Sequence, residues 1–261
     1  MPRPMRTAVR TAYYSVLDVF DAITGNRHEF QPPRRLFYIG GGDYKKIGAD
    51  YLHRFIHDCA LKPEGKVLDI GCGTGRIAVP LMAYLNERGS YDGFDIDPRG
   101  ILWCVANITA KKPNFRFLAA DIYNEEYNPK GTQKAHEYRF PYADNTFDLV
   151  TLISVFTHMF PMDIEHYLRE ISRVTKPGGF SLITYYLFNK SKGYLNTRGG
   201  TLNFQNDCGA YRTISKEVPE AAVCCDEDSI LGLYKKCGLE LAHPVEYGKN
   251  RQDIIVARKP I

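Results

Sequence analysis

The fold is decided by the stretch Val67-Leu68-Asp69-Ile70-Gly71-Cys72-Gly73-Thr74-Gly75-Arg76. A short apolar run leads directly into three glycines at alternate positions, and a helical pattern follows them. Glycine lets the backbone turn sharply and lets a ligand approach closely, because it has no Cβ. The N-terminus of the following helix supplies unpaired N–H groups and positive dipole character. These features predict a cradle for a nucleotide-like ligand at the carboxyl edge of a sheet.

The spacing of the glycines distinguishes between kinds of nucleotide ligand. A dinucleotide site has the pattern Gly-x-Gly-x-x-Gly, whereas here Arg76 holds the third position and Gly75 comes one residue early. A P-loop would need Gly-Lys followed by Ser or Thr, and this turn has no such residues. The turn therefore disfavours a pyrophosphate ligand.

Short apolar runs alternate with helical patterns around this turn, which is typical of strand–helix–strand units with a parallel sheet. The predicted strands are 66–70, 91–95, 115–119, 147–153 and 180–187. The predicted helices are 74–88, 98–110 and one across 164–174 that is stopped by Pro177-Gly178-Gly179. A helix at 228–237 precedes two last strands at 239–246 and 253–258. The short link between these strands predicts an antiparallel hairpin.

The flanking segments predict the domain organisation. Residues 1–42 are expected to form an N-terminal helix and a loop that covers the pocket, and residues 43–261 the main domain. The helix is amphipathic, with Gly25 as its stop, and its apolar residues are Val9, Tyr13, Val16, Leu17 and Phe20. A substrate-side insertion at about 189–225 is rich in Gly, Asn, Thr and Lys and shows no clear period. We expect this insertion to act as a partial lid.

Two acidic residues follow the second and third predicted strands. Asp95 lies 20 residues after Gly75, and a carboxylate at that edge can accept both ribose hydroxyls of a nucleoside. Asp121 ends the third strand and can accept an adenine amino group. Ile96 and Ile122 follow these strands and can pack on the two faces of the ring.

These residues resemble the class I S-adenosylmethionine-dependent methyltransferases of the small-molecule type. The resemblance spans roughly 43–260, and its motifs lie at 67–76, 93–98, 117–122, 147–158 and 168–180. It implies an α/β fold with a doubly wound, seven-stranded, mostly parallel sheet and an antiparallel terminal hairpin, the Rossmann-like methyltransferase fold. It also implies S-adenosylmethionine as the cofactor and methyl transfer as the reaction.

The resemblance assigns cofactor contacts to residues of these motifs, namely Asp69, Gly71, Cys72, Gly73, Gly75, Asp95, Ile96, Asp121, Ile122 and Ser154. The candidate catalytic base is His158, which follows the fourth strand; the alternative is that it caps or packs the next helix. Tyr185 and Tyr186 are candidates for the acceptor pocket or for packing in the sheet. Lys45 or Lys46 is a candidate for the cofactor carboxylate or for a solvated face.

Composition and charge give no support to several classes of protein. The chain has 34 basic and 30 acidic residues, a net charge of +4, and no Lys/Arg block that would track nucleic acid. Its seven cysteines have no zinc-type spacing, so no metal is expected and a cytoplasmic location is favoured. The longest apolar run is 149–156, too short to span a membrane, so no membrane partner is expected. The sequence does not indicate an oligomeric state.

The predicted function is methyl transfer to an O or N atom of a small organic acceptor. The insertion carries polar and aromatic residues, which point to a sugar or a natural product; they are Tyr194, Asn203, Phe204, Asn206, Tyr211 and Arg212. The alternatives are another use of the same cofactor or fold, such as aminopropyl transfer, and a non-catalytic regulatory or partner module that binds S-adenosylmethionine.

Overall fold

The computed structural model describes residues 3–25, 29–36, 42–125, 127–249 and 251–261 of the chain. Its centre is a seven-stranded sheet with the order β11-β12-β5-β4-β1-β2-β3. The strands of this sheet are β1 (Lys66–Ile70), β2 (Ser90–Asp95), β3 (Phe115–Ala119), β4 (Phe147–Leu152), β5 (Thr175–Tyr185), β11 (Glu240–Leu241) and β12 (Asp253–Arg258). β1 to β5 pair in parallel, and β12 runs antiparallel to both β5 and β11. The predicted doubly wound sheet with its terminal antiparallel hairpin is therefore confirmed.

The order of the strands reverses at β1, which lies between β2 and β4. In an open parallel sheet, such a point leaves a crevice outside the carboxyl ends of the strands. The residues that directly follow β1 and β4 therefore face this crevice from its two sides.

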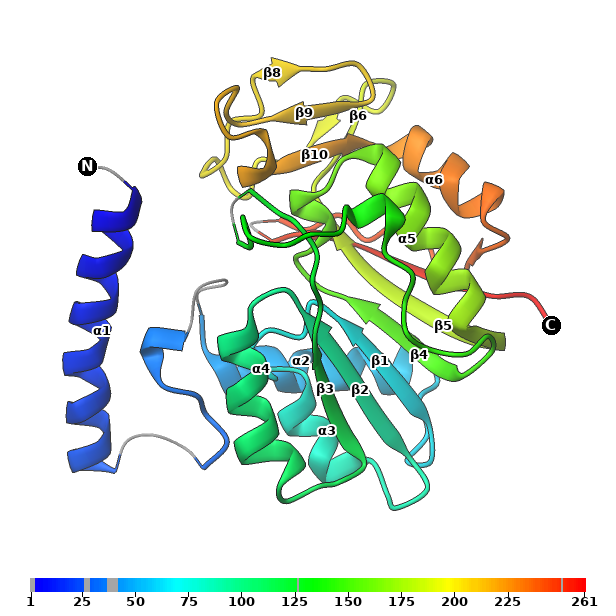
Figure 1. The fold of residues 1–261 in the computed structure, drawn as a ribbon. Helices are drawn as coiled ribbons and strands as arrows, with labels where there is room; N and C mark the ends of the chain where they lie inside the picture. The colour runs from blue at the N-terminus through cyan, green and yellow to red at the C-terminus, as the bar shows by residue number, and fades with distance from the viewer. Residues whose placement is uncertain (1–2, 26–28, 37–41, 126, 250) are drawn as a thin grey trace.

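Helices cover both faces of the sheet (Figure 1). Leu68 packs toward one face and its neighbour Val67 toward the other, because successive strand residues point to opposite sides. The core that includes Val67 takes residues from α2 (Tyr44–His57), α3 (Ala78–Tyr84) and α4 (Pro98–Cys104), the last of which continues as the π-helical turn η2 (Val105–Thr109). The core that includes Leu68 takes residues from α5 (Pro161–Val174) and α6 (Glu227–Lys236).

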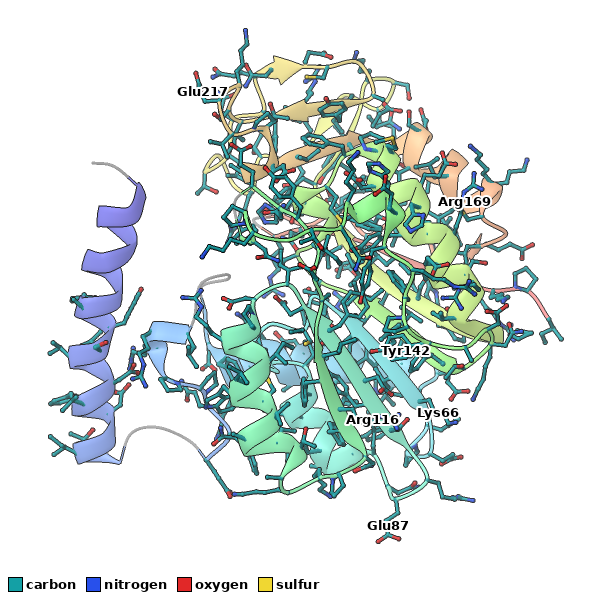
Figure 2. All side chains as sticks on the ribbon, in the orientation of Figure 1. Lys66, Glu87, Arg116, Tyr142, Arg169 and Glu217 are labelled. Carbon is teal, nitrogen blue, oxygen red and sulfur yellow. The ribbon has the colours of Figure 1, made fainter. Side chains whose placement is uncertain are left out.

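A second sheet of five strands occupies the inserted region, in the order β7-β6-β10-β9-β8. These strands are β6 (Leu187–Asn189), β7 (Tyr194–Leu195), β8 (Asn206–Asp207), β9 (Tyr211–Thr213) and β10 (Val223–Asp226), with the short helix η5 (Pro219–Ala221) between the last two. A separate core of Tyr186, Phe188, Phe204, Ala222 and Cys224 lies beneath the sheet. Figure 2 shows Glu217 of this region and Glu87, which follows α3, at opposite ends of the molecule. The insertion is thus a built sheet, where the sequence predicted a segment without a regular period.

Two predicted helices differ from the structure at their ends. The helix expected from Thr74 begins only at Ala78, because Gly75 has a φ of +78° and is not helical. The stretch Pro177-Gly178-Gly179, which was predicted to stop the helix before it, lies within β5, and that helix already ends at Val174. Gly178 N–H donates to the Lys259 carbonyl, and Lys259 N–H donates to Gly179. This exchange with the C-terminus extends the strand backwards to the end of α5.

The N-terminal helix α1 (Arg3–Thr24) stands apart from both sheets (Figure 1). It contacts the short helix η1 (Arg34–Leu36). Residues 37–41 of the expected covering loop lie outside the described residues. Within the described ranges, no helix is both long enough and apolar enough to cross a bilayer.

Candidate active site

A cavity of about 180 Å³ lies at the carboxyl ends of β1, β2 and β4. It has more than ten times the room that one water molecule needs, ~10–15 Å³. Three segments that follow neighbouring strands line it, which are residues 71–74, 95–96 and 153–155. Of the segment 1–42 that was predicted to cover the pocket, Leu36 lines this cavity.

The glycine turn shapes one wall of the cavity. Gly71, Gly73 and Gly75 all have φ between +55° and +78°, the left-handed region that favours glycine. A Cβ on Gly71 would lie 2.2 Å from Val155 Cγ2, so the turn and the segment after β4 are in close contact. A Cβ on Gly73 would meet no protein atom within 4 Å. Since Gly73 lines the cavity, that space is available to a ligand.

Asp95 ends β2 beside this turn and is buried, with 7% of its surface exposed. Its two carboxylate oxygens accept hydrogen bonds from the backbone N–H groups of Gly73 and Asp97, each at 2.8 Å. These two bonds fix the plane of the carboxylate at the cavity wall. A carboxylate oxygen has a second lone pair, so Asp95 can also accept hydroxyl groups of a ligand.

Asp121 and Ile122 lie on different sides of the chain. Ile122 is buried and lines the cavity together with Ile96. Asp121 is exposed and is not among the lining residues. Its carboxylate accepts hydrogen bonds from the backbone N–H and the hydroxyl of Thr132. The carboxylate of Asp121 therefore holds the following loop, and the adenine contact expected of it stays a prediction.

Asp69 lies at the floor of the cavity and is almost fully buried. Burial raises the pKa of Asp69 to about 7; the hydrogen bond from the Tyr91 hydroxyl acts in the opposite direction, and the nearby charge of Asp95 adds to the rise. That hydrogen bond measures 2.6 Å. The acid at the floor is therefore partly protonated near neutral pH.

Cys72 and Gly75, the remaining residues of the turn, differ in position. Cys72 lines the cavity, and burial raises the pKa of its thiol well above the ordinary value. Gly75 is not among the lining residues. A Cβ there would lie 2.8 Å from Ile108 Cδ1 and 3.1 Å from Cys104 Sγ. Gly75 therefore serves the close packing of the turn against α4 and η2.

His158 reaches the cavity from η4 (Phe156–His158), the short helix after β4. Its Nδ1 lies 2.8 Å from the carbonyl oxygen of Glu220 in η5. A carbonyl only accepts, so Nδ1 carries a proton, and in the neutral form of the ring the lone pair is on Nε2. The ring also packs edge-on against Tyr127, with centroids 5.4 Å apart. The inserted region thus sets the tautomer and orientation of this histidine.

Ser154 lines the cavity between the glycine turn and His158. Its φ is +61°, an uncommon backbone conformation for a residue other than glycine. Its backbone N–H donates to Thr184 Oγ1 at 2.8 Å, and its hydroxyl lies 3.0 Å from Gln252 Oε1. Strained residues held by their surroundings cluster at functional sites.

The cavity also contains residues that the sequence did not single out. Tyr51 from α2, Arg76 after the glycine turn and Tyr127 line it, whereas Lys45 and Lys46 do not. Burial lowers the pKa of Arg76, and its guanidinium lies 5.8 Å from the centroid of the Tyr44 ring. The signal for Arg76 was its position directly after Gly75.

The aromatic candidates of β5 and the insertion pack elsewhere. Tyr185 is buried in the main core with its hydroxyl 2.9 Å from that of Tyr234, and Tyr186 packs against Phe204. The residues on which a sugar acceptor was inferred are absent from the cavity lining; these are Tyr194, Asn203, Phe204, Asn206, Tyr211 and Arg212. Within the ranges that the structure describes, no group of three His, Cys, Asp or Glu side chains is placed to hold a metal ion.

Comparison with known proteins identifies the domain around this cavity. Residues 67–179 match the family described as "Methyltransferase domain". An uncharacterized methyltransferase of Schizosaccharomyces pombe is 30% identical over 58% of this chain, and the match spans about half, 52%, of that relative's length. The ubiquinone/menaquinone biosynthesis C-methyltransferase UbiE of Vibrio cholerae is 23% identical over 72% of this chain and 69% of its own length.

Other relatives are named for methylating a sterol, phosphoethanolamine or a tRNA cytidine, so the relatives do not share one acceptor. A solved structure of a SAM-dependent methyltransferase from Aquifex aeolicus has a TM-score of 0.51 and 18% identity, and the alignment covers 84% of this chain and all of that one. At this identity the likeness shows the fold. Residues 67–179 of the chain therefore match a methyltransferase domain in sequence, and the chain shares the fold of a solved SAM-dependent methyltransferase.

Proposed function

We propose that this chain transfers a methyl group from S-adenosylmethionine to a small organic acceptor. The observation that carries the proposal is the shared cavity: the glycine turn, the carboxylate of Asp95 and the imidazole of His158 line one hollow at the reversal point of the sheet. Ligands bind at this place in open α/β sheets.

The residues of the cavity fit the cofactor. Gly73 leaves open space where any other residue would project a Cβ, and Asp95 offers a fixed carboxylate for the ribose hydroxyls. Ile96 and Ile122 provide apolar surface for the adenine ring. The guanidinium of Arg76 is the lining cation suited to the carboxylate of the methionine part. When bound, the cofactor supplies an electrophilic methyl group on a sulfonium.

The acceptor side is formed by His158 and Tyr51, which come from different elements. In this proposal the protein holds the acceptor in line with the methyl group and keeps water out, and such positioning is worth ~7–11 kcal/mol. His158 takes the acceptor's proton through Nε2, where the acceptor atom is an O or N that still carries one. Asp69 and Ser154 support the cofactor side of the site.

The acceptor class belongs to the same proposal. The lining includes many apolar side chains, among them Leu36, Ile47 and Met159, which favours an acceptor with an apolar part over a sugar. Exclusion of nucleic acid is also part of the proposal, supported by the mild net charge of +4. A cytoplasmic location is also part of the proposal, and the seven free thiols support it.

Calorimetry with S-adenosylmethionine and S-adenosylhomocysteine tests the cofactor site, and we expect micromolar binding of both. Turnover of cofactor labelled in its methyl group, against an extract of metabolites, tests catalysis. Labelled product would support the enzyme. Binding without transfer to any acceptor would favour a regulatory or partner module, and absence of binding would overturn the proposal.

A further inference from the structure

One face of α1 carries five large apolar side chains exposed to solvent. Their exposed fractions run from 59% to 79%, and the residues are Tyr13, Val16, Val19, Phe20 and Ile23. Spacings of three, four and seven residues place side chains on one side of a helix. Single exposed apolar residues are ordinary, but a contiguous patch of this kind marks an interaction surface.

The helix is held to the rest of the chain by its opposite face. Asp18 and Asp21 are buried, with 4% and 7% of their surface exposed. Asp18 accepts from the backbone N–H of Arg34 and forms an ion pair with Arg35, and Asp21 accepts from Arg34 Nε at 2.6 Å. These contacts with η1 hold α1 so that its apolar face points away from the chain.

The charges of α1 indicate the chemistry of its partner. The helix contains Arg3, Arg6 and Arg10, and its two acidic residues are Asp18 and Asp21. In the sequence of this helix, Arg6 and Arg10 precede Tyr13 by seven and three positions. Both carboxylates are engaged with arginines of η1. A second copy of α1 would therefore offer these arginines no exposed carboxylate, whereas an anionic surface complements them.

We propose that α1 is a docking helix for an anionic membrane surface. Helices of this kind lie in the plane of the interface, with the apolar face at the boundary of headgroups and acyl chains and the arginines toward anionic lipid. The sequence prediction of no membrane partner rested on the lack of a spanning run, which a surface helix does not need. Docking goes beyond the proposed function and does not depend on it.

The position of α1 links docking to the cavity. Arg34 and Arg35 of η1 hold the helix, and Leu36 of the same turn lines the cavity. A docked α1 therefore places one turn of the cavity lining beside the membrane-bound helix, which suits an acceptor dissolved in the bilayer. This consequence for the acceptor, unlike docking itself, rests on the proposed function.

Co-sedimentation of the full chain with vesicles tests the proposal. We expect binding to vesicles of phosphatidylcholine mixed with phosphatidylserine, weaker binding to phosphatidylcholine alone, and a decrease with added salt. The double variant Val16→Ser/Phe20→Ser should lose binding. Arg6→Gln/Arg10→Gln should weaken it about fivefold for each arginine removed. The matched control is Met162→Ser, an apolar residue of α5 that is 63% exposed, which should bind like the unmodified chain.

Three results would overturn docking. The first is no co-sedimentation with either kind of vesicle, and the second is undiminished binding by Val16→Ser/Phe20→Ser. The third is a concentration-dependent dimer, seen by sedimentation velocity without lipid, that this variant abolishes, because the face would then join two copies. Calorimetry with S-adenosylhomocysteine on the same samples reports the cofactor site separately, so failure of the proposed function is recognised independently.

Discussion

Asp69 combines full burial with a raised pKa, which makes it a source of pH-dependent stability. Its pKa in the folded chain is about 7, against ~4 for an unperturbed aspartate. Between these values the folded chain holds a proton that the unfolded chain has released. The contribution of Asp69 to the free energy of unfolding is therefore complete below pH ~4 and is lost as the pH rises toward 7.

The variant Asp69→Asn should remove this slope, because an amide stays neutral over the whole range. Urea unfolding from pH 4 to 8 should show the variant gaining stability relative to the unmodified chain by roughly 1.4 kcal/mol for each pKa unit removed. Tyr91→Phe, which deletes the hydrogen bond that lowers this pKa, should move the slope to higher pH. Parallel pH profiles for all three proteins would contradict this account of Asp69.

Asp95 should account for a large part of the cofactor affinity. Removing a charged hydrogen-bond partner from a buried site costs ~1.5–3 kcal/mol, so Asp95→Ala should weaken binding of S-adenosylhomocysteine by at least tenfold in calorimetry. The matched control is Asp92→Ala on the same strand, since Asp92 is equally buried but pairs with Arg116 and does not line the cavity. A loss below tenfold for Asp95→Ala, or an equal loss for both variants, would remove Asp95 from the site.

His158 should affect turnover but not the binding of the cofactor. If it accepts the acceptor's proton, His158→Ala should lower kcat by ~10²–10⁴ and abolish the acidic limb of the pH profile of kcat/KM. The measurement uses the acceptor found in the labelled-methyl screen, with calorimetry of S-adenosylhomocysteine as the check on folding. Unchanged turnover and an unchanged pH profile would leave His158 with a packing role.

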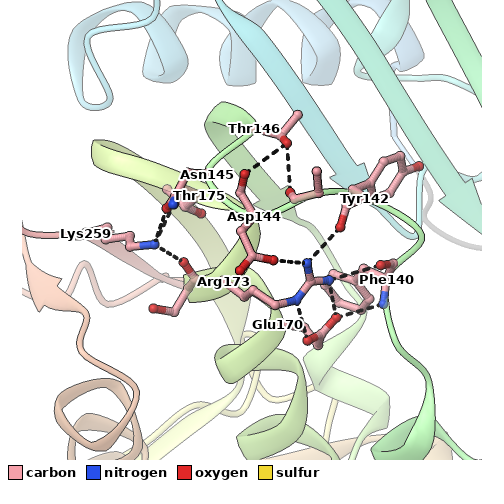
Figure 3. Close-up of polar contacts among 11 residues, drawn as sticks. Phe140, Tyr142, Asp144, Asn145, Thr146, Glu170, Arg173, Thr175 and Lys259 are labelled. Carbon is pink, nitrogen blue, oxygen red and sulfur yellow. Dashed lines mark hydrogen bonds and ion pairs between the residues drawn. The ribbon is translucent and has the colours of Figure 1, made fainter.

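At the scale of single elements, Arg173 fastens the loop before β4 to α5 (Figure 3). Its guanidinium donates to both oxygens of Glu170, to Asp144 and to the carbonyls of Phe140 and Tyr142. Glu170 in turn accepts the backbone N–H of Phe140 at 2.8 Å. The ion pair thereby holds the path of the loop that leads into the fourth strand.

Arg173→Met should destabilise the fold by ~3 kcal/mol, the lower end for breaking a buried pair, because it leaves Glu170 buried without its cation. Arg169→Met is the matched control on the same helix, since Arg169 is 58% exposed and pairs with Glu165 at the surface; it should cost less than ~1 kcal/mol. Urea denaturation measures both. Equal losses would show that the Arg173 contacts contribute no more than a surface pair.

The elements that sequence could predict are those with a local cause. β1 and β3 were predicted with their observed ends, because short apolar runs bounded by turn residues predict strands. The strands β7 to β10 have only two to four residues each, too few to show a period. These strands form because they pack over a core that includes Tyr186 and Phe204, two residues that lie far apart in the sequence.

The candidate site also contains some residues that sequence could place and others that it could not. Gly73, Asp95 and Ile96 follow predicted strands, so sequence could place them together at the carboxyl edge. Asp121 and Ile122 differ by one residue and point to opposite sides of an extended chain, and sequence did not show which side faced the cavity. The place of Tyr51 depends on how α2 packs over the turn, which no local pattern encodes.

At the scale of the whole molecule, a few polar contacts join parts that are distant in sequence. Arg54 of α2 and Glu246 near the C-terminus are 192 residues apart, and two hydrogen bonds of 2.6 and 2.7 Å join them. Glu227 of α6 accepts hydrogen bonds from Lys192 in the inserted region and from the Tyr247 hydroxyl. The segment between β11 and β12 is therefore joined to α2 through Glu246, and to α6 and the inserted region through Tyr247.

Asp253 is central to this junction. It is fully buried at the start of β12, and burial raises its pKa. Its carboxylate accepts the backbone N–H of Leu187 at 2.8 Å, the Tyr194 hydroxyl at 2.6 Å and the backbone N–H of Gly248 at 2.9 Å. One side chain of the main sheet thus holds both β6 and β7 of the inserted sheet.

Asp253→Ala should destabilise the inserted sheet more than the main sheet, because each buried donor left without an acceptor costs ~1–3 kcal/mol and two of the three donors belong to the insertion. Hydrogen exchange should show early loss of protection in β6, β9 and β10 while β1 and β4 stay protected. Asp253→Asn keeps one acceptor oxygen, so its loss of protection should lie between those of the unmodified chain and Asp253→Ala. Asp207→Ala, an exposed acid of β8 paired with Arg212, should change protection little. A uniform loss of protection over both sheets would instead mean that they unfold as one cooperative unit.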